Sequence, residues 1–157
     1  MPAPSSLAAL ALEIGLAEAE AGVYEDPPHS NRGPRVDVYQ TGRASLGQAW
    51  CLKFVNWCYA QAATRLSVPN PLPPIYLVSA FLDWARKQGK IVTEPMKGDI
   101  LVKKPAQHVG LVLTELVGGD VFSSVEGNTF TSDPEKEGVY VVKRLHAGKY
   151  EFVRVAT

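Results

Sequence analysis

The chain has 157 residues, enough for one domain that buries a sizeable core without a metal ion or a disulfide to stabilise it. Its 16 Lys and Arg residues balance its 16 Asp and Glu residues, so no net positive charge favours binding to nucleic acid or to anionic lipid. No apolar run approaches the ~20 residues that a membrane span needs. We therefore expect neither nucleic-acid binding nor membrane insertion.

The first predicted helix runs from Ser5 or Ser6 to about Ala21, with a serine cap at its start and Gly22 at its end. Its apolar composition is similar to that of a signal peptide, but no Lys or Arg precedes it and glutamates lie inside it. We therefore expect a folded helix in a protein that is made in the cytoplasm without a recognisable export signal.

Three more helices are predicted further along the chain. Residues 24–34 are rich in proline and turn formers and predict a loop, which a short helix over 36–39 follows. After a second loop over 41–48, a helix with one apolar side extends from Cys51 to about Leu66. The last helix is predicted over 76–88.

After Gly89 the sequence changes to short segments rich in β-branched residues, which Gly, Pro and Asp turns separate. Strands are predicted over 99–104, 108–114, 120–126, 139–144 and 150–155. Because helices come first and strands follow without alternation, the sequence indicates an α+β fold with an antiparallel sheet of about five strands. No internal repeat or composition change marks a boundary, so residues 1–157 are expected to form a single domain.

Two cysteines lie on the helix that begins at Cys51. Cys51 and Cys58 would stand about 10 Å apart along its axis, too far for a disulfide. The N-terminus of a helix offers unpaired N–H groups and a positive dipole end, which favour thiolate and make Cys51 a candidate nucleophile. Cys58 is expected to be a small buried residue. Neither cysteine has the close Cys or His neighbours of a zinc site, so no metal is predicted.

Three histidines are candidates for the base that Cys51 would need. His29 lies in a proline-rich loop and His146 in a turn, whereas His108 opens a strong strand that forms a rigid platform. On that strand His108 and Gly110 share a face, so we expect clear space beside the imidazole. The alternative is that His108 is only a partly exposed residue at a strand end.

The next strand ends in the sequence Glu126-Gly127-Asn128. In extended geometry Glu126 and Asn128 point to the same face, so either could orient the imidazole of His108 from a neighbouring strand. A carboxylate would also stabilise imidazolium charge, whereas an amide would fix only its direction. The alternative is that these residues form an ordinary turn.

Five blocks follow one another along the chain: NRGPRVDVYQ, AWCLKFVNWCY, KGDILV, HVGLVL and VEGNTF. Together they resemble the CHAP family of cysteine amidohydrolases and peptidases, which is related to the NlpC-type cell-wall hydrolases. The resemblance extends from roughly Gly22 to Thr129. It implies a papain-like fold that cleaves amide bonds of bacterial peptidoglycan, either as an N-acetylmuramoyl-L-alanine amidase or as a peptide endopeptidase. It also implies that Cys51 is the nucleophile, His108 the base and Glu126 or Asn128 the third residue.

The resemblance carries further expectations for the site. The oxyanion would bind the N–H of Cys51, with Gln48 as a candidate second donor, and Trp50 could either line the substrate groove or pack in the core. Lys53 replaces a residue that is usually small or apolar in the family, and we expect it to be solvated rather than catalytic. The stretch before Cys51 lacks the acidic calcium loop of some phage members, so no calcium or other cofactor is predicted.

A phage endolysin or a bacterial lytic effector would suit these features, with a holin or a secretion system for delivery and a monomer as the expected state. No separate wall-binding domain is expected. Two alternatives stay open: a cysteine amidase or peptidase that acts on another amide, and a non-catalytic module of the wall or the virion.

Overall fold

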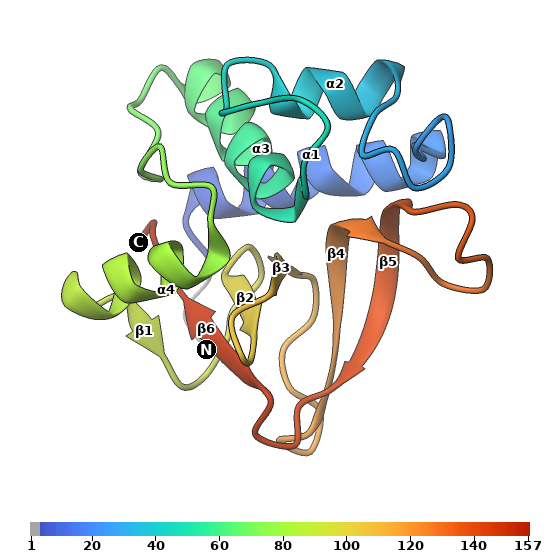
Figure 1. Ribbon diagram of the computed structural model, residues 1–157. Coiled ribbons are helices and arrows are strands. Elements are labelled where there is room, and N and C mark those ends of the chain that lie inside the picture. Colours follow the sequence, from blue (N-terminus) through green and yellow to red (C-terminus); the bar gives the residue numbers. More distant parts are fainter. Residues whose placement is uncertain (1–3) are drawn as a thin grey trace.

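The computed structural model describes residues 4–157 and has an α+β fold, as predicted. Its helices come first and its strands follow (Figure 1). The helices are α1 (Ser6–Ala21), α2 (Pro34–Gln40), α3 (Cys51–Leu66) and α4 (Val78–Lys87). The strands are β1 (Ile91–Val92), β2 (Ile100–Lys103), β3 (His108–Val112), β4 (Val121–Thr129), β5 (Gly138–Leu145) and β6 (Tyr150–Val153).

Local signals set the ends of α1 as the sequence predicts. The Ser5 hydroxyl accepts a hydrogen bond from the N–H of Ala8 at 3.1 Å, and Gly22 ends the helix with a left-handed φ of 77°. α4 begins two residues later than predicted, at Val78 rather than Tyr76. Within residues 4–157, no helix combines the length and the apolar composition that crossing a membrane requires.

The strands form one antiparallel sheet in the order β1-β6-β2-β3-β4-β5. It has six strands rather than the predicted five or so, because the two residues of β1 are too few to show a period in the sequence. β4 continues to Thr129, past its predicted end at Glu126, and its pairing with β5 shifts between Glu126 and Thr129. This bulge changes the direction of the side chains near the end of β4.

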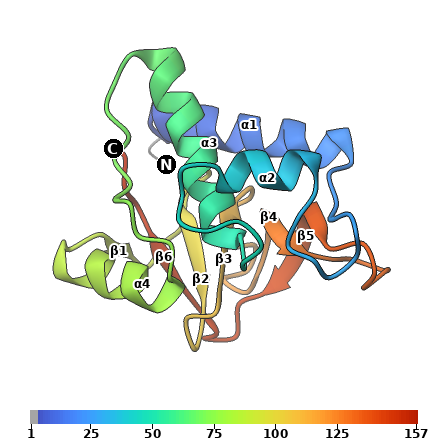
Figure 2. The ribbon, with the colours of Figure 1, turned by 45° about the horizontal axis from the view of Figure 1, so that its top comes forward.

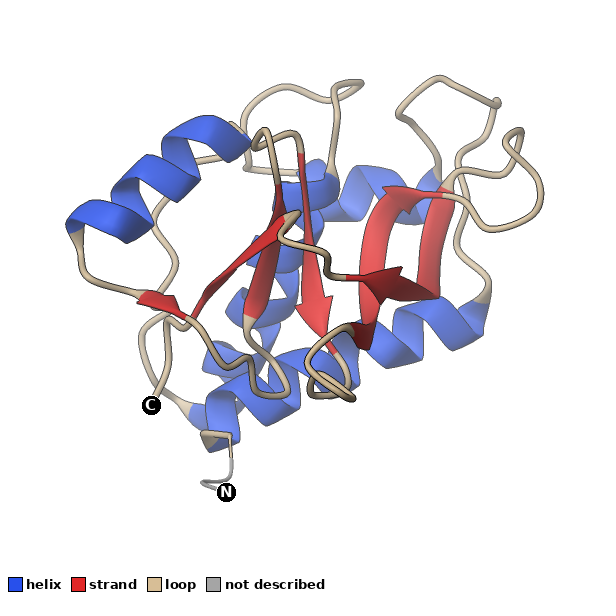
Figure 3. Ribbon diagram, turned by 90° about the horizontal axis from the view of Figure 1, so that it is seen from below, coloured by secondary structure: helices blue, strands red, loops and turns tan. Residues whose placement is uncertain are grey.

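The main core lies between the helices and one face of the sheet. Figures 1 and 2 show α1 and α3 crossing over the strands, with α2 beside them and α4 next to β1 and β6. Val109, Leu111 and Val125 of the sheet belong to this core, as do most residues in the first half of α3. A smaller buried cluster forms on the other face, which lies in front when the molecule is seen from below (Figure 3); it contains Leu101, Val112, Phe122, Tyr150 and Phe152.

Candidate active site

Cys51 is the first residue of α3, and the N-terminal end of this helix points toward the sheet, near β3 and β4 (Figure 1). Its neighbour Trp50 caps the helix without a side-chain hydrogen bond, with φ −122° and ψ 12°. The thiol is largely enclosed, because Cys51 is 5% exposed. The helix terminus brings unpaired N–H groups and the positive dipole end to this enclosed sulfur.

His108 begins β3 and links Cys51 to Glu126. Its Nε2 lies 2.7 Å from Oε1 of Glu126, which leaves Nδ1 as the ring nitrogen available to Cys51. Burial lowers the pKa of His108, but the hydrogen bonds and the negative charges of Cys51 and Glu126 outweigh this effect and raise the pKa to about 9. The imidazole is therefore protonated at neutral pH.

Glu126 is fully buried, and three groups hold its carboxylate. Besides His108, Arg144 donates from Nε at 3.0 Å and from a terminal nitrogen, and the Ser124 hydroxyl donates at 2.5 Å. Burial raises the pKa of Glu126, but the hydrogen bonds from His108 and Arg144 bring it down to about 2. A carboxylate held in this way stays ionised and keeps the imidazole in one direction.

Strand register explains how these groups meet. β3 pairs with β4 so that Val112 lies opposite Ser124, and His108 therefore shares a face with Ser124 and Glu126. β5 pairs with β4 so that Arg144 lies opposite Phe122, on the same face again. Neither Arg144 nor Ser124 was predicted as a site residue, because only the register of these strands relates them to Glu126.

Gly110 lies on this face next to His108, as predicted, but the expected clear space is filled. A Cβ atom on Gly110 would stand 2.4 Å from Cγ of Glu126. The glycine thus lets the Glu126 side chain lie over β3 and reach the imidazole, and any larger residue would displace that side chain.

Asn128, the second candidate orienter, has a different set of contacts. It lies in the bulge of β4 with a left-handed φ of 59°, and its Oδ1 accepts the N–H of Trp50 at 2.8 Å. Its Nδ2 donates to Glu137 at 3.1 Å. Glu126 therefore contacts His108, whereas Asn128 fixes the backbone just before Cys51. The expectation that both point to one face fails because of the bulge.

Trp50 packs in the core and does not line a groove, since it is 0% exposed. Its indole N–H donates to Oε2 of Glu25 at 2.8 Å, and the buried Glu25 also accepts the N–H of Asn31 at 3.1 Å. Gly127 permits this packing, because a Cβ there would stand 2.7 Å from Cζ3 of Trp50. The role of Glu25 was not predicted, because nothing in the loop sequence distinguishes a buried acid from a solvated one.

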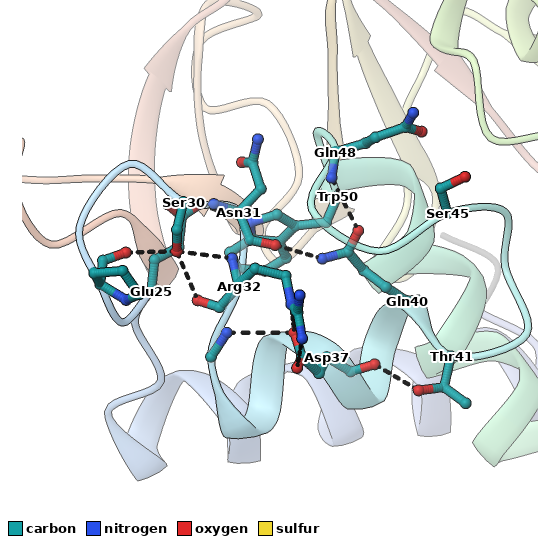
Figure 4. A network of polar contacts seen from close by, with 12 residues as sticks. Glu25, Ser30, Asn31, Arg32, Asp37, Gln40, Thr41, Ser45, Gln48 and Trp50 are labelled. Atoms are coloured by element: carbon teal, nitrogen blue, oxygen red, sulfur yellow. Dashed lines mark hydrogen bonds and ion pairs between the residues drawn. The ribbon is translucent and has the colours of Figure 1, made fainter.

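Gln48 is exposed, and its backbone N–H lies 3.4 Å from Oε1 of Gln40. In Figure 4 its side-chain amide points away from the network around Gln40. A role for Gln48 in the oxyanion site stays a prediction.

The expectation that Lys53 is solvated is wrong. Lys53 is 2% exposed, and its Nζ donates to Oε1 of Gln40 at 3.0 Å and to the carbonyl of Ser45 at 2.6 Å. Burial lowers the pKa of this amine. Gln40 in turn donates to the carbonyl of Asn31 at 2.7 Å, so Lys53 ties both loops that precede Cys51 to the start of α3 (Figure 4 shows Gln40, Asn31 and Ser45).

A polar groove of about 480 Å³ opens at the imidazole. It extends from the ends of β2 and β3 over the bulge of β4 toward β5, and its lining residues are Lys103, His108, Asn128, Thr129, Phe130, Glu137 and Arg144. Phe130 is 48% exposed and offers an apolar surface within this otherwise polar groove. The groove is large enough for a short peptide segment next to His108.

The remaining histidines and the second cysteine have other surroundings. His29 is exposed and lies 3.0 Å from Glu137 and 3.2 Å from Glu135. His146 packs against the rings of Tyr150 and Phe152, in the cluster on the other sheet face. Both cysteines are free, as expected.

Cys58 is fully buried, as predicted, and burial raises the pKa of its thiol well above the usual range.

Cys51, His108 and Glu126 bring together a thiol at a helix start, an imidazole near it and a carboxylate that orients the imidazole, which are groups that nucleophilic chemistry can use. Within residues 4–157, no three or more His, Cys, Asp or Glu side chains gather in a way that could hold a metal ion. Comparison of the chain with protein-family models, with curated proteins and with solved structures gives no match.

Proposed function

We propose that this protein is a cysteine hydrolase that cleaves an amide bond of bacterial peptidoglycan. One observation carries the catalytic part of the proposal: His108 contacts a buried, ionised Glu126, and both Glu126 and the nearby Cys51 raise the pKa of its imidazole. A raised imidazole pKa next to a thiol at a helix N-terminus supports a thiolate–imidazolium pair.

In the proposed mechanism Cys51 is the nucleophile, and His108 first gives up a proton and then takes one back. The Cys51 thiolate attacks the amide carbonyl, and the N–H groups at the start of α3 stabilise the oxyanion. The C–N bond then breaks while His108 gives its proton to the leaving amine, which leaves a thioester on Cys51. A water molecule next loses a proton to His108 and attacks the thioester, which releases the acid and restores the pair. Glu126 keeps Nδ1 of His108 directed at the sulfur throughout.

The resemblance to the CHAP family supports peptidoglycan as the substrate and a papain-like architecture as the fold family. The groove beside His108 is polar and carries both signs of charge, which suits a peptide with ionised side chains. The bond cut is either the one between muramic acid and L-alanine or one within the peptide. A phage endolysin or a bacterial lytic effector is the proposed setting, with a holin or a secretion system for delivery.

The decisive experiment follows the turbidity of purified cell walls and identifies the products by mass spectrometry. We expect wall lysis by the unaltered protein, loss of lysis with Cys51→Ala, and retention of lysis with the matched control Cys58→Ala. A new free lactyl carboxylate identifies an amidase, and a new peptide N-terminus identifies an endopeptidase. Lysis that persists with Cys51→Ala would contradict the nucleophile. If walls stay intact but other amides are cut in a Cys51-dependent way, the substrate is wrong and the chemistry is right.

A further inference from the structure

Lys103 lies beside the imidazole on the wall of the groove. It is the last residue of β2, and the register of β2 on β3 places it directly opposite His108. Side chains that face each other across two antiparallel strands have Cβ atoms about 5 Å apart and share one sheet face. Lys103 is exposed and lines the groove together with His108. Its ammonium can therefore reach a substrate that occupies the groove next to His108.

The other cations around the groove have acidic partners. Arg144 and Glu126 form a bidentate ion pair, and the imidazole of His108 lies 2.7 Å from the same carboxylate. At the other end of the groove Glu137 faces His29, whose pKa is raised by its hydrogen bonds with Glu135 and Glu137. Within residues 4–157, Lys103 has no ion-pair partner. It is thus the one uncompensated cation that lines the groove.

Arg144 adds hydrogen-bond donors on the same wall. Its Nε and one terminal nitrogen bond to Glu126, and its side chain is 23% exposed where it lines the groove. A guanidinium has five N–H donors, so the groups not directed at Glu126 are left for a ligand. A carboxylate between Lys103 and Arg144 would receive donors from both, while Glu137 at the opposite end would repel it.

From this geometry we infer that the groove selects amide substrates that carry a free carboxylate beside the scissile bond, with Lys103 as the specificity-determining residue. The inference rests on the proposed function and names its substrate class: acidic peptides rather than peptides whose acid is amidated. The fixed positions of Lys103 and Glu137 also give the substrate one direction in the groove.

The test compares two synthetic muramoyl peptides, which contain both candidate bonds and differ in one group, a free carboxylate or a carboxamide on the residue beside the cleaved bond. We expect kcat/KM to favour the carboxylate about fivefold or more, a preference that rising salt concentration reduces. In Lys103→Met we expect the ratio of kcat/KM for the carboxylate peptide to kcat/KM for the carboxamide peptide to approach one. Lys143→Met is the matched control, because Lys143 is exposed, adjoins Arg144 on β5 and lies outside the groove lining; it keeps the ratio of the unaltered protein.

Binding of both peptides to Cys51→Ala, measured by calorimetry, separates this inference from the proposed hydrolysis. Tighter binding of the carboxylate peptide, with no cleavage of either peptide by the unaltered protein, would leave the inference standing and overturn the proposed function. Equal cleavage of both peptides, or a ratio that Lys103→Met does not change, would overturn the inference and leave the proposed function standing. Absence of both binding and cleavage would overturn both.

Discussion

Helix α3 carries two cysteines with opposite surroundings. Cys51 lies in its first turn, next to the imidazole of His108, and Cys58 lies two turns further on, fully buried against α1. A Cβ atom on Gly15 of α1 would stand 3.6 Å from Sγ of Cys58, which shows how closely the two helices approach there. Burial raises the pKa of the Cys58 thiol, and no histidine within residues 4–157 bonds to it.

The two cysteines share a residue type and a helix, so neither of these sets the surroundings of a thiol. Position along the helix decides whether free N–H groups are nearby, and the partner strand decides whether a base is nearby. Cys51 has both the free N–H groups and the base nearby, and Cys58 has neither.

The largest expected difference is in thiol labelling. In the folded protein we expect iodoacetamide to modify Cys51 and to leave Cys58 untouched. Because Cys58 can react only when the core opens, the two labelling rates should differ by about 10³-fold or more. Mass spectrometry of tryptic peptides measures both rates in one sample. Equal labelling of the two cysteines would contradict the expected difference between their surroundings.

Next in size is the effect of the third residue. Glu126→Gln keeps the shape but removes the charge that faces His108, and we expect kcat to fall about 100-fold or more. Asn128→Ala removes the acceptor for the Trp50 N–H and is expected to cost about 1–2 kcal/mol of unfolding free energy, with a smaller loss of kcat. Steady-state kinetics and urea unfolding of both variants separate the two roles. A larger loss of kcat in Asn128→Ala than in Glu126→Gln would mean that Asn128, and not Glu126, orients His108.

The pH dependence gives a third test. Because the pKa of His108 is about 9, the imidazolium loses its proton above that pH and kcat/KM should fall about tenfold per pH unit, whereas alkylation of Cys51 should persist. The raised pKa of His108 also stabilises the folded state. This contribution is fully present below the unfolded pKa of 6.5 and is lost as pH rises through about 9.

An NMR titration locates the cause of that pKa. In Cys51→Ala the pKa of His108 should drop, because the hydrogen bond and charge of Cys51 no longer raise it. In Cys58→Ala it should not change. An unchanged titration in Cys51→Ala would mean that Cys51 and His108 do not interact.

The smallest effect concerns packing alone. Cys58→Ala leaves a small cavity between α1 and α3, and we expect a loss of about 1 kcal/mol of unfolding free energy without a change in kcat/KM. Chemical denaturation with a parallel activity assay measures both quantities. A loss of activity at full stability would give Cys58 a role that its surroundings do not indicate.

The features that sequence predicted are those with local causes. The serine cap and Gly22 delimit α1, and the alternation of apolar residues reveals the longer strands. Cys51 and His108 stand out because each lies at the end of an element that its own sequence defines. The pairing of Glu126 with Arg144 depends on strand register, and the direction of Asn128 depends on a bulge; neither segment encodes these features alone.

Lys53 and Glu25 show a second limit of sequence. Charged side chains are usually solvated, and only the fold provides the Gln40 and Ser45 acceptors of Lys53 or the Trp50 donor of Glu25. Both residues fix the approach of the chain to Cys51, so the errors fall next to the site rather than far from it.

The anchoring of Trp50 has a consequence for how the site comes into being. Its side chain is bound by Glu25 from the N-terminal third of the chain, and its backbone N–H by Asn128 from the far end of β4. The thiol therefore gains its geometry only when segments about a hundred residues apart have closed on each other, a step with a high entropic cost. During synthesis a nascent chain that already contains Cys51 has neither His108 nor Asn128, so assembly of the site coincides with completion of the sheet.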